Sequence, residues 1–144
     1  MAGVIEPALT AGVPYDDMGR AVRWLTQILG LRVARMWGPE DDPIFVYLSW
    51  RDQILSIAVR PPSDNPWSAM GPVSFSLLAD EDTIRATWDR AVAAGADVIR
   101  PLGVHSNPAV PDGYVGFVLR DPEGNMWSMH SRGATFELVE GEPK

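Results

Sequence analysis

The sequence predicts an α+β fold built from two tandem βαβββ modules, each a strand, a helix and three further strands. Two segments place apolar residues at helical spacing, and runs rich in β-branched and aromatic residues surround each of them. The two halves also match by residue, because a shift of 64 positions places Thr10 on Ser74 and Trp24 on Trp88. A repeat of this length indicates one structural unit used twice.

The first module begins with a strand over residues 9–14 and a helix over residues 17–29. Apolar residues of this helix recur at steps that place them on one face: Met18, Val22, Leu25 and Leu29. Asp16 or Asp17 caps the start of the helix, and Gly30 supplies the left-handed residue after its end. Three strands complete the module, over residues 31–37, 44–50 and 53–60.

The second module repeats this layout, with a strand over residues 73–79 and a helix over residues 82–94. Asp80 or Asp82 caps the helix, and Gly95 ends it. The three strands that follow are expected over residues 96–101, 114–120 and 125–131. A loop over residues 103–113, which contains His105, separates the first two of these strands.

We expect one domain over residues 1–144, which is the usual length for a single domain. The two repeats cover about residues 8–60 and 73–132. Residues 61–72 are rich in proline and form the natural linker between them. The acidic tail over residues 133–144 is expected to be partly disordered.

Composition and charge exclude several classes of protein. The hydrophobic fraction of 46% and charged fraction of 22% are those of a globular chain, and no apolar run is long enough for a membrane span. The first residues carry no basic and apolar secretion signal, so we expect a cytoplasmic protein. There is no cysteine. The net charge of -7 makes nucleic acid and anionic membranes poor partners and leaves a small molecule as the expected one.

Four segments carry a resemblance to a known family: residues 17–21, 28–31, 93–96 and 116–127, the last reading GFVLRDPEGNMW. With them the chain resembles the vicinal oxygen chelate superfamily, which includes glyoxalase I, extradiol dioxygenases, and the fosfomycin, bleomycin and mitomycin resistance proteins. The resemblance covers residues 8–132. It implies a curved mixed sheet with the helices outside, and a homodimer whose cavities are built by both chains.

In the metalloenzymes that this chain resembles, four inward-facing residues hold a divalent ion. The matching positions here are Thr10, Ser56, Ser74 and Ser128. Neutral hydroxyls are poor ligands for such an ion, so the resemblance points to the metal-free branch, with no metal and no cofactor. Asp52 and His130 lie nearest to these positions. A metalloenzyme that uses such displaced ligands stays a third hypothesis.

The same hydroxyl positions predict a cavity for an organic ligand. We expect its lining to consist of Thr10, Ser56, Ser74, Ser76, Met126 and Ser128. Aromatic residues at strand ends or in the linker are candidates for stacking on the ligand, although surface burial explains them equally well: Trp37, Trp50 and Trp67. Tyr47 and Phe45 share one face of their strand and are weaker candidates. Core packing explains Trp24, Trp88 and Trp127.

Two functions follow from this pattern. The first is sequestration of a planar or aromatic small molecule, such as an antibiotic or another natural product, without chemistry. The alternative is a cofactor-independent isomerase, cyclase or lyase in which His130 or His105 acts as the base. For each histidine a structural position is the favoured interpretation, a solvated loop residue for His105 and a hydrogen-bonded rim residue for His130. Whether the chain is an enzyme stays undecided at this point.

Overall fold

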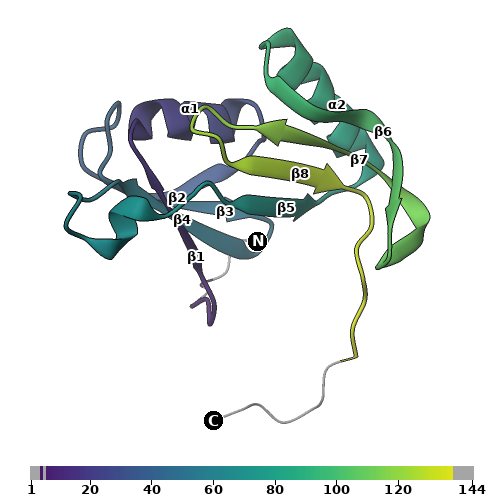
Figure 1. Cartoon of the computed structure of the whole chain (residues 1–144), viewed down its shortest axis with the longest axis horizontal. Helices are drawn as coiled ribbons and strands as arrows, with labels where there is room; N and C mark the ends of the chain where they lie inside the picture. Colours follow the sequence, from purple (N-terminus) through teal and green to yellow (C-terminus); the bar gives the residue numbers. More distant parts are fainter. Residues whose placement is uncertain (1–3, 5, 138–144) are drawn as a thin grey trace.

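The computed structural model describes residue 4 and residues 6–137. Within them the chain forms two four-stranded sheets, each accompanied by one α-helix. Figure 1 shows both helices along one side of the molecule and the two sheets beneath them. The α+β class and the tandem βαβββ order are therefore confirmed. The predicted tail lies mostly outside the described residues.

The first module has a mixed sheet in the order β1-β4-β3-β2, in which β1 runs parallel to β4 and the other pairs are antiparallel. Its elements are β1 (Ala11–Tyr15), α1 (Met18–Gln27), β2 (Arg32–Trp37), β3 (Phe45–Trp50) and β4 (Gln53–Val59).

The second module has the matching order β5-β8-β7-β6, again with one parallel pair, β5 with β8. Its elements are β5 (Ser74–Leu78), α2 (Glu81–Ala93), β6 (Asp97–Asn107), β7 (Val110–Arg120) and β8 (Met126–His130). Corresponding strands take the same positions in the two sheets, so the sequence repeat corresponds to a structural repeat.

The ends of both helices are set by the residues that the sequence offered. The Asp17 side chain accepts a hydrogen bond from the backbone N–H of Arg20, and Asp80 does the same for Thr83. Gly30 and Gly95 follow the helices with φ of 85° and 69°, a left-handed conformation that favours glycine.

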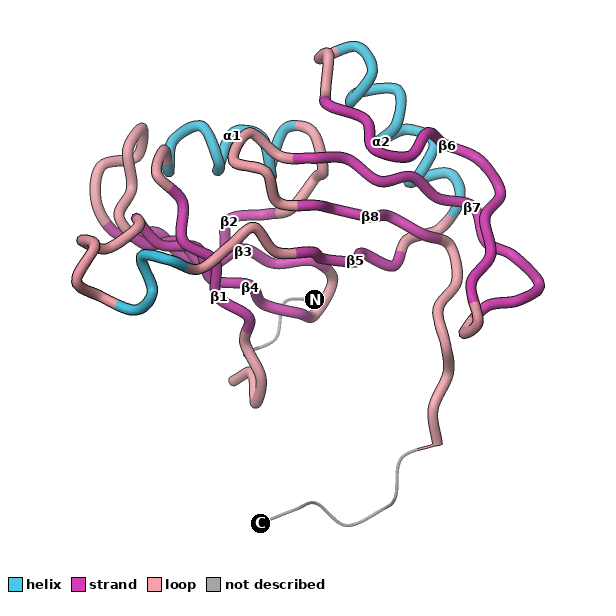
Figure 2. The backbone as a smooth tube through the Cα atoms, in the orientation of Figure 1, coloured by secondary structure: helices cyan, strands magenta, loops and turns pink. Residues whose placement is uncertain are grey.

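Two regions differ from the sequence prediction. The linker contains a short 3-10 helix, η1 (Pro66–Ala69), which begins where the Asn65 side chain accepts a hydrogen bond from the backbone N–H of Trp67. Figure 2 shows this turn in cyan between β4 and β5. The predicted loop over residues 103–113 is wrong, because β6 and β7 continue into one long hairpin. His105 therefore lies on a strand, opposite Tyr114.

One apolar core lies between the helices and the sheets of both modules. Alternate residues of β3, Val46 and Leu48, point into it, and Phe117 and Leu119 of β7 do the same in the second module. Trp127 is 1% exposed, which confirms its predicted place in the core. Trp24 and Trp88 pack against the same core. Since one face of each sheet is buried here, the opposite face is left to form a site.

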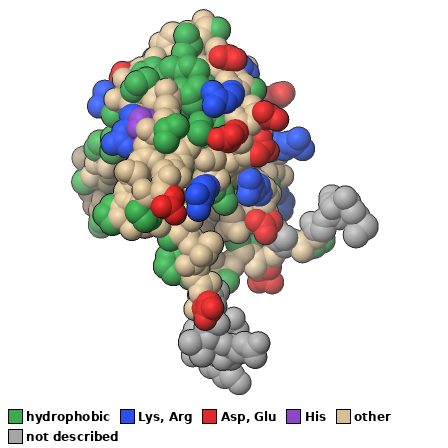
Figure 3. Space-filling view, turned by 90° about the vertical axis from the view of Figure 1, so that its right-hand side faces the viewer, with side chains coloured by type: hydrophobic (Ala, Val, Ile, Leu, Met, Phe, Trp, Pro, Cys, Tyr) green, Lys and Arg blue, Asp and Glu red, His purple; other side chains and the backbone are tan. Residues whose placement is uncertain are grey.

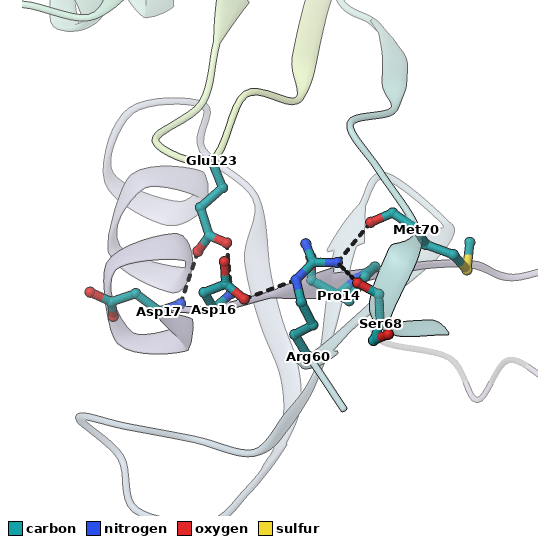
Figure 4. A network of polar contacts seen from close by, with 7 residues as sticks. All are labelled: Pro14, Asp16, Asp17, Arg60, Ser68, Met70 and Glu123. Carbon is teal, nitrogen blue, oxygen red and sulfur yellow. Dashed lines mark hydrogen bonds and ion pairs between the residues drawn. The ribbon is translucent and has the colours of Figure 1, made fainter. Parts of the chain in front are cut away.

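Polar contacts hold the two modules together. Glu123, in the turn before β8, accepts hydrogen bonds from the backbone N–H groups of Asp16 and Asp17 at 2.6 and 2.9 Å (Figure 4). Arg60 pairs with Asp16 at 2.8 Å and also donates to the carbonyl oxygens of Ser68 and Met70. These contacts fix the linker against the start of α1.

No helix within the described residues is long and apolar enough to cross a membrane.

Candidate functional site

The open face of the first sheet carries three aromatic rings. The ring centroids of Trp37, Phe45 and Tyr47 lie 5.1 to 5.7 Å apart, and each pair meets edge to face. These residues alternate along their strands with the core residues Val46 and Leu48, so they point away from α1. Trp37 remains 37% exposed, so part of this aromatic surface is open to a ligand.

Ser56 shares this face, because it lies opposite Tyr47 on one side and Gly12 on the other. The indole of Trp67 lies over Gly12: a Cβ atom on Gly12 would approach Trp67 Cη2 to 2.8 Å and Ser56 Oγ to 3.2 Å. The linker thus brings a fourth aromatic side chain onto the first sheet. We call the set Gly12, Trp37, Phe45, Tyr47, Ser56 and Trp67 the aromatic face.

Arg35 adds a cation to the aromatic face. Its guanidinium carbon lies 4.8 Å from the ring centroid of Trp37, which is a cation–π distance. Arg35 is not among the site residues predicted from the sequence. Its alternation with Trp37 along β2 was the signal that places it on the same face.

The open face of the second sheet carries hydroxyl and imidazole groups. Ser76 lies opposite Ser128, with their Oγ atoms 2.8 Å apart, and Ser74 lies opposite Met126. His130 follows Ser128 on the same face of β8. Five of the predicted site residues therefore lie together.

A cavity of about 150 Å³ lies on this second face. The ring of Tyr114 stands between His105 and His130, with centroid distances of 6.1 and 5.9 Å. Burial lowers the pKa of His130, which keeps the imidazole neutral near pH 7. His105 Nε2 lies 3.1 Å from the carbonyl oxygen of Pro101. Sequence reasoning did not include Tyr114 among the site residues, although it placed this residue at the start of the strand over residues 114–120.

Two predicted site residues do not join these faces. Thr10 precedes β1 and is exposed. Trp50 has the strand parity of Val46 and Leu48, so it points to the core side, where its Nε1–H donates to the carbonyl oxygen of Leu78 at 2.9 Å. It lines a separate cavity of about 400 Å³ between the modules.

The family model of the Glyoxalase/Bleomycin resistance protein/Dioxygenase superfamily matches residues 8–129, which is most of the chain. The chain belongs to this superfamily. The match covers both modules and ends within β8, one residue before His130. A search of curated proteins found no significant relative.

Solved structures of the superfamily fold are similar over nearly the whole chain. TioX from Micromonospora sp. ML1 has a TM-score of 0.66 at 21% identity and covers 88% of this chain and 98% of its own. Lactoylglutathione lyase from Agrobacterium tumefaciens has a TM-score of 0.63 at 20% identity and covers 87% and 94%. Oxidase ChaP-H2 has a TM-score of 0.67 at 22% identity and covers 91% and 97%. At these identities the likeness shows the fold alone.

The residues that the resemblance matches to the superfamily's metal positions do not fit a divalent ion. Thr10, Ser56, Ser74 and Ser128 offer hydroxyl oxygens, whereas such ions are held by carboxylate or imidazole donors. Among the described residues, no group of three or more His, Asp or Glu side chains is placed to bind a metal. Asp52 lies at the turn between β3 and β4, and His130 lies on the second sheet.

Sequence reasoning also missed Asp121, a carboxylate that is only 4% exposed. Its Oδ2 accepts hydrogen bonds from the Tyr15 hydroxyl at 2.5 Å, Asn125 Nδ2 at 3.0 Å and Trp127 Nε1 at 3.0 Å. Burial, with this carboxylate as a second cause, raises the pKa of Tyr15. All these partners belong to the core and to the turn before β8. Because Tyr15 comes from the first module, Asp121 helps to hold the two modules together.

Proposed function

We propose that this protein binds a planar or aromatic small molecule, such as an antibiotic or another natural product, without a metal ion. The observation that carries the proposal is the aromatic face, where three rings meet edge to face and stay partly exposed. Aromatic side chains that have a well-packed arrangement normally lie inside a core. Here they stand on the solvent side of a sheet whose other side already fills the core.

The chemistry of the aromatic face suits a flat ligand. Stacking of one aromatic pair adds about 0.5–1.5 kcal/mol beyond the burial of apolar area. Three rings on one sheet and Trp67 from the linker can therefore give a drug-sized ligand an affinity in the micromolar to nanomolar range. The Ser56 hydroxyl, which donates to the carbonyl oxygen of Ala11 at 3.3 Å, can accept a hydrogen bond that orients the ligand on the sheet.

We also propose that the protein is a homodimer in which a second copy helps to enclose the ligand. Within one chain the aromatic face and the face with Ser76 and His130 belong to different sheets, and both carry partly exposed residues. A drug-sized ligand is usually buried by 70–90% or more, which an open sheet does not provide. A second chain over the faces would supply the missing walls.

Native mass spectrometry of the protein purified from its own host tests the proposal. We expect a dimer that carries an intact aromatic metabolite. With that metabolite identified, Trp37→Ala should weaken binding by about tenfold or more, because it removes a stacking partner. Trp88→Phe is the matched control, since Trp88 packs against the core near Phe117. Equal affinity in Trp37→Ala and the unmodified protein would refute the role of the aromatic face.

A cofactor-independent isomerase, cyclase or lyase is the second candidate, favoured by the surroundings of His130. This imidazole lies in the 150 Å³ cavity beside Ser128, and its lowered pKa leaves it neutral and able to take a proton. The discriminating experiment compares His130→Gln with the unmodified protein for turnover of the bound metabolite. Loss of turnover with retained binding would establish the enzyme, and recovery of unchanged metabolite from both proteins would favour sequestration.

A further inference from the structure

The cavity on the second sheet is built to receive negative charge. Four of its lining residues carry hydrogen-bond donors or positive charge: Arg100, Tyr114, His130 and Arg132. The Ser128 hydroxyl and His105 Nε2 line it too, but they already contact the carbonyl oxygens of Phe75 and Pro101. No aspartate or glutamate lines it among the described residues. We infer that this cavity binds the carboxylate of a small aromatic acid, and that the ligand of the proposed function is therefore an anion.

The charge of the whole chain makes this composition informative. The sequence has nineteen acidic residues against twelve basic ones, so an ordinary cavity of this protein would include carboxylates. On the face drawn in Figure 3, a purple histidine surface lies next to blue arginine side chains. A cavity with positive potential inside a negative protein both attracts an anion and selects it against neutral molecules.

A second arginine cluster lacks these properties. The groove between α1 and α2 is lined by Arg20, Arg23, Arg90 and Arg120, but two carboxylates line it too, Asp97 and Asp121. Asp97 pairs with Arg120 at 3.1 Å. Arg90 donates to the carbonyl oxygen of Ile28 at 3.0 Å, which ties the second helix to the first. Within the described part of the chain, Arg100 and Arg132 form no such ion pair.

The size of the second-sheet cavity limits what enters it. Its volume of about 150 Å³ is close to that of an apolar cavity that holds one benzene ring. Whole drug-sized ligands need about 300–1,000 Å³. The cavity therefore takes one end of a molecule, a single ring with its carboxylate, while the rest of the ligand lies outside. Tyr114 supplies an aromatic side chain against which that ring can rest.

This inference rests on the proposed function, since it names the chemical class of the same ligand. It can be tested without that ligand, with benzoate as the probe and the neutral benzamide as its isostere. A fragment of this size with charge-assisted hydrogen bonds should bind with a dissociation constant of about 1 mM. We expect benzamide to bind about tenfold more weakly, because it lacks the charge.

The readout is the NMR signal of the His130 ring, followed during titration with each probe. Benzoate should shift this signal and raise the pKa of His130, because a bound anion favours the protonated imidazole. The groups that face this imidazole are Tyr114, Arg100 and Arg132, with His105 beyond Tyr114, and no described carboxylate lines the same cavity.

Two variants complete the test. Arg100→Gln and Arg132→Gln should each weaken benzoate binding about tenfold. Arg85→Gln is the matched control, because Arg85 is exposed on α2 and lines none of the three cavities, and its affinity should not change. Equal binding of benzoate and benzamide, no binding of benzoate, or unchanged affinity in both cavity variants would overturn the inference.

The two proposals fail in different ways. If benzoate binds as expected but Trp37→Ala keeps full affinity for the host metabolite, the aromatic face is wrong and the anion cavity stands. If the metabolite binds through Trp37 but proves neutral and leaves the His130 signal unchanged, the anion cavity is wrong and the proposed function stands.

Discussion

Asp121→Asn is the substitution for which the structure predicts the largest loss of stability. The change keeps the size of the side chain but replaces one carboxylate oxygen by an NH2 group. Asp121 Oδ2 accepts three side-chain hydrogen bonds, and Oδ1 accepts the backbone N–H groups of Glu123 and Asn125 at 2.9 and 3.0 Å. A carboxamide has a single oxygen, so it can accept hydrogen bonds either from the side-chain donors at Oδ2 or from the backbone donors at Oδ1, but not from both.

The magnitude follows from counting the donors that lose their acceptor. If the amide NH2 replaces Oδ2, the Trp127 Nε1–H and the Asn125 side chain are left without a partner, while the Tyr15 hydroxyl can turn and accept. If it replaces Oδ1, both backbone N–H groups lose their partner. Either orientation leaves two buried donors unsatisfied at about 1–3 kcal/mol each, so we expect a loss of about 3–5 kcal/mol.

Urea unfolding followed by tryptophan fluorescence measures this loss as a lower midpoint at unchanged slope. Asp97→Asn is the control, because the pair of Asp97 with Arg120 is exposed, with side-chain accessibilities of 59% and 47%. It should change the free energy of unfolding by less than about 1 kcal/mol. A loss below about 1 kcal/mol in Asp121→Asn would show that the buried network does not hold the modules together.

Three further predictions concern pH and packing. Because the pKa of Tyr15 is raised in the folded chain, only the unfolded chain loses this proton above the ordinary value of 10.0, so stability should fall above that pH by about 1.4 kcal/mol per unit, and urea midpoints of Tyr15→Phe should lack this decline. The lowered pKa of His130 gives stability the opposite dependence on pH, because the unfolded chain takes up the proton first as pH falls below 6.5. Stability should therefore decrease below that pH, and calorimetry should find a smaller decrease in His130→Gln. Gly12→Ala should displace the Trp67 indole at a cost of about 1 kcal/mol. The displacement should change the tryptophan emission spectrum of the protein, with Trp67→Phe as the reference that identifies the contribution of this ring. An unchanged spectrum in Gly12→Ala would contradict the contact.

Local signals explain why most of the fold could be predicted from the sequence. Each helix start had an aspartate able to cap it, and each helix end had a glycine for the left-handed residue, so the boundaries agree within one or two residues. The hairpin of β6 and β7 escaped prediction because its segment contains Pro101, Pro108 and Gly113, which oppose a strand locally. Pairing with β7 outweighs that preference, and such pairing is a long-range contact.

The candidate site was predictable where strand parity was enough. Tyr47 and Ser56 fall on one face because side chains alternate along a strand. The same rule places Trp50 with Val46 and Leu48 on the core side, so counting from these core residues separates it from Trp37. Trp67 could not be placed in this way, because no strand holds it. The contact of its ring with Gly12 arises from the path of the linker.

Gly12 and Ser76 show how one repeated module came to carry two kinds of chemistry. They match under the same shift of 64 positions as Thr10 and Ser74, and each lies opposite a serine of the parallel strand, Ser56 or Ser128. In the second module the side chain of Ser76 pairs its hydroxyl with Ser128, which keeps a polar surface. In the first module the missing side chain leaves the space that the Trp67 ring fills. Serine at position 12 would exclude that ring, so the aromatic face depends on this glycine as much as on its aromatic residues.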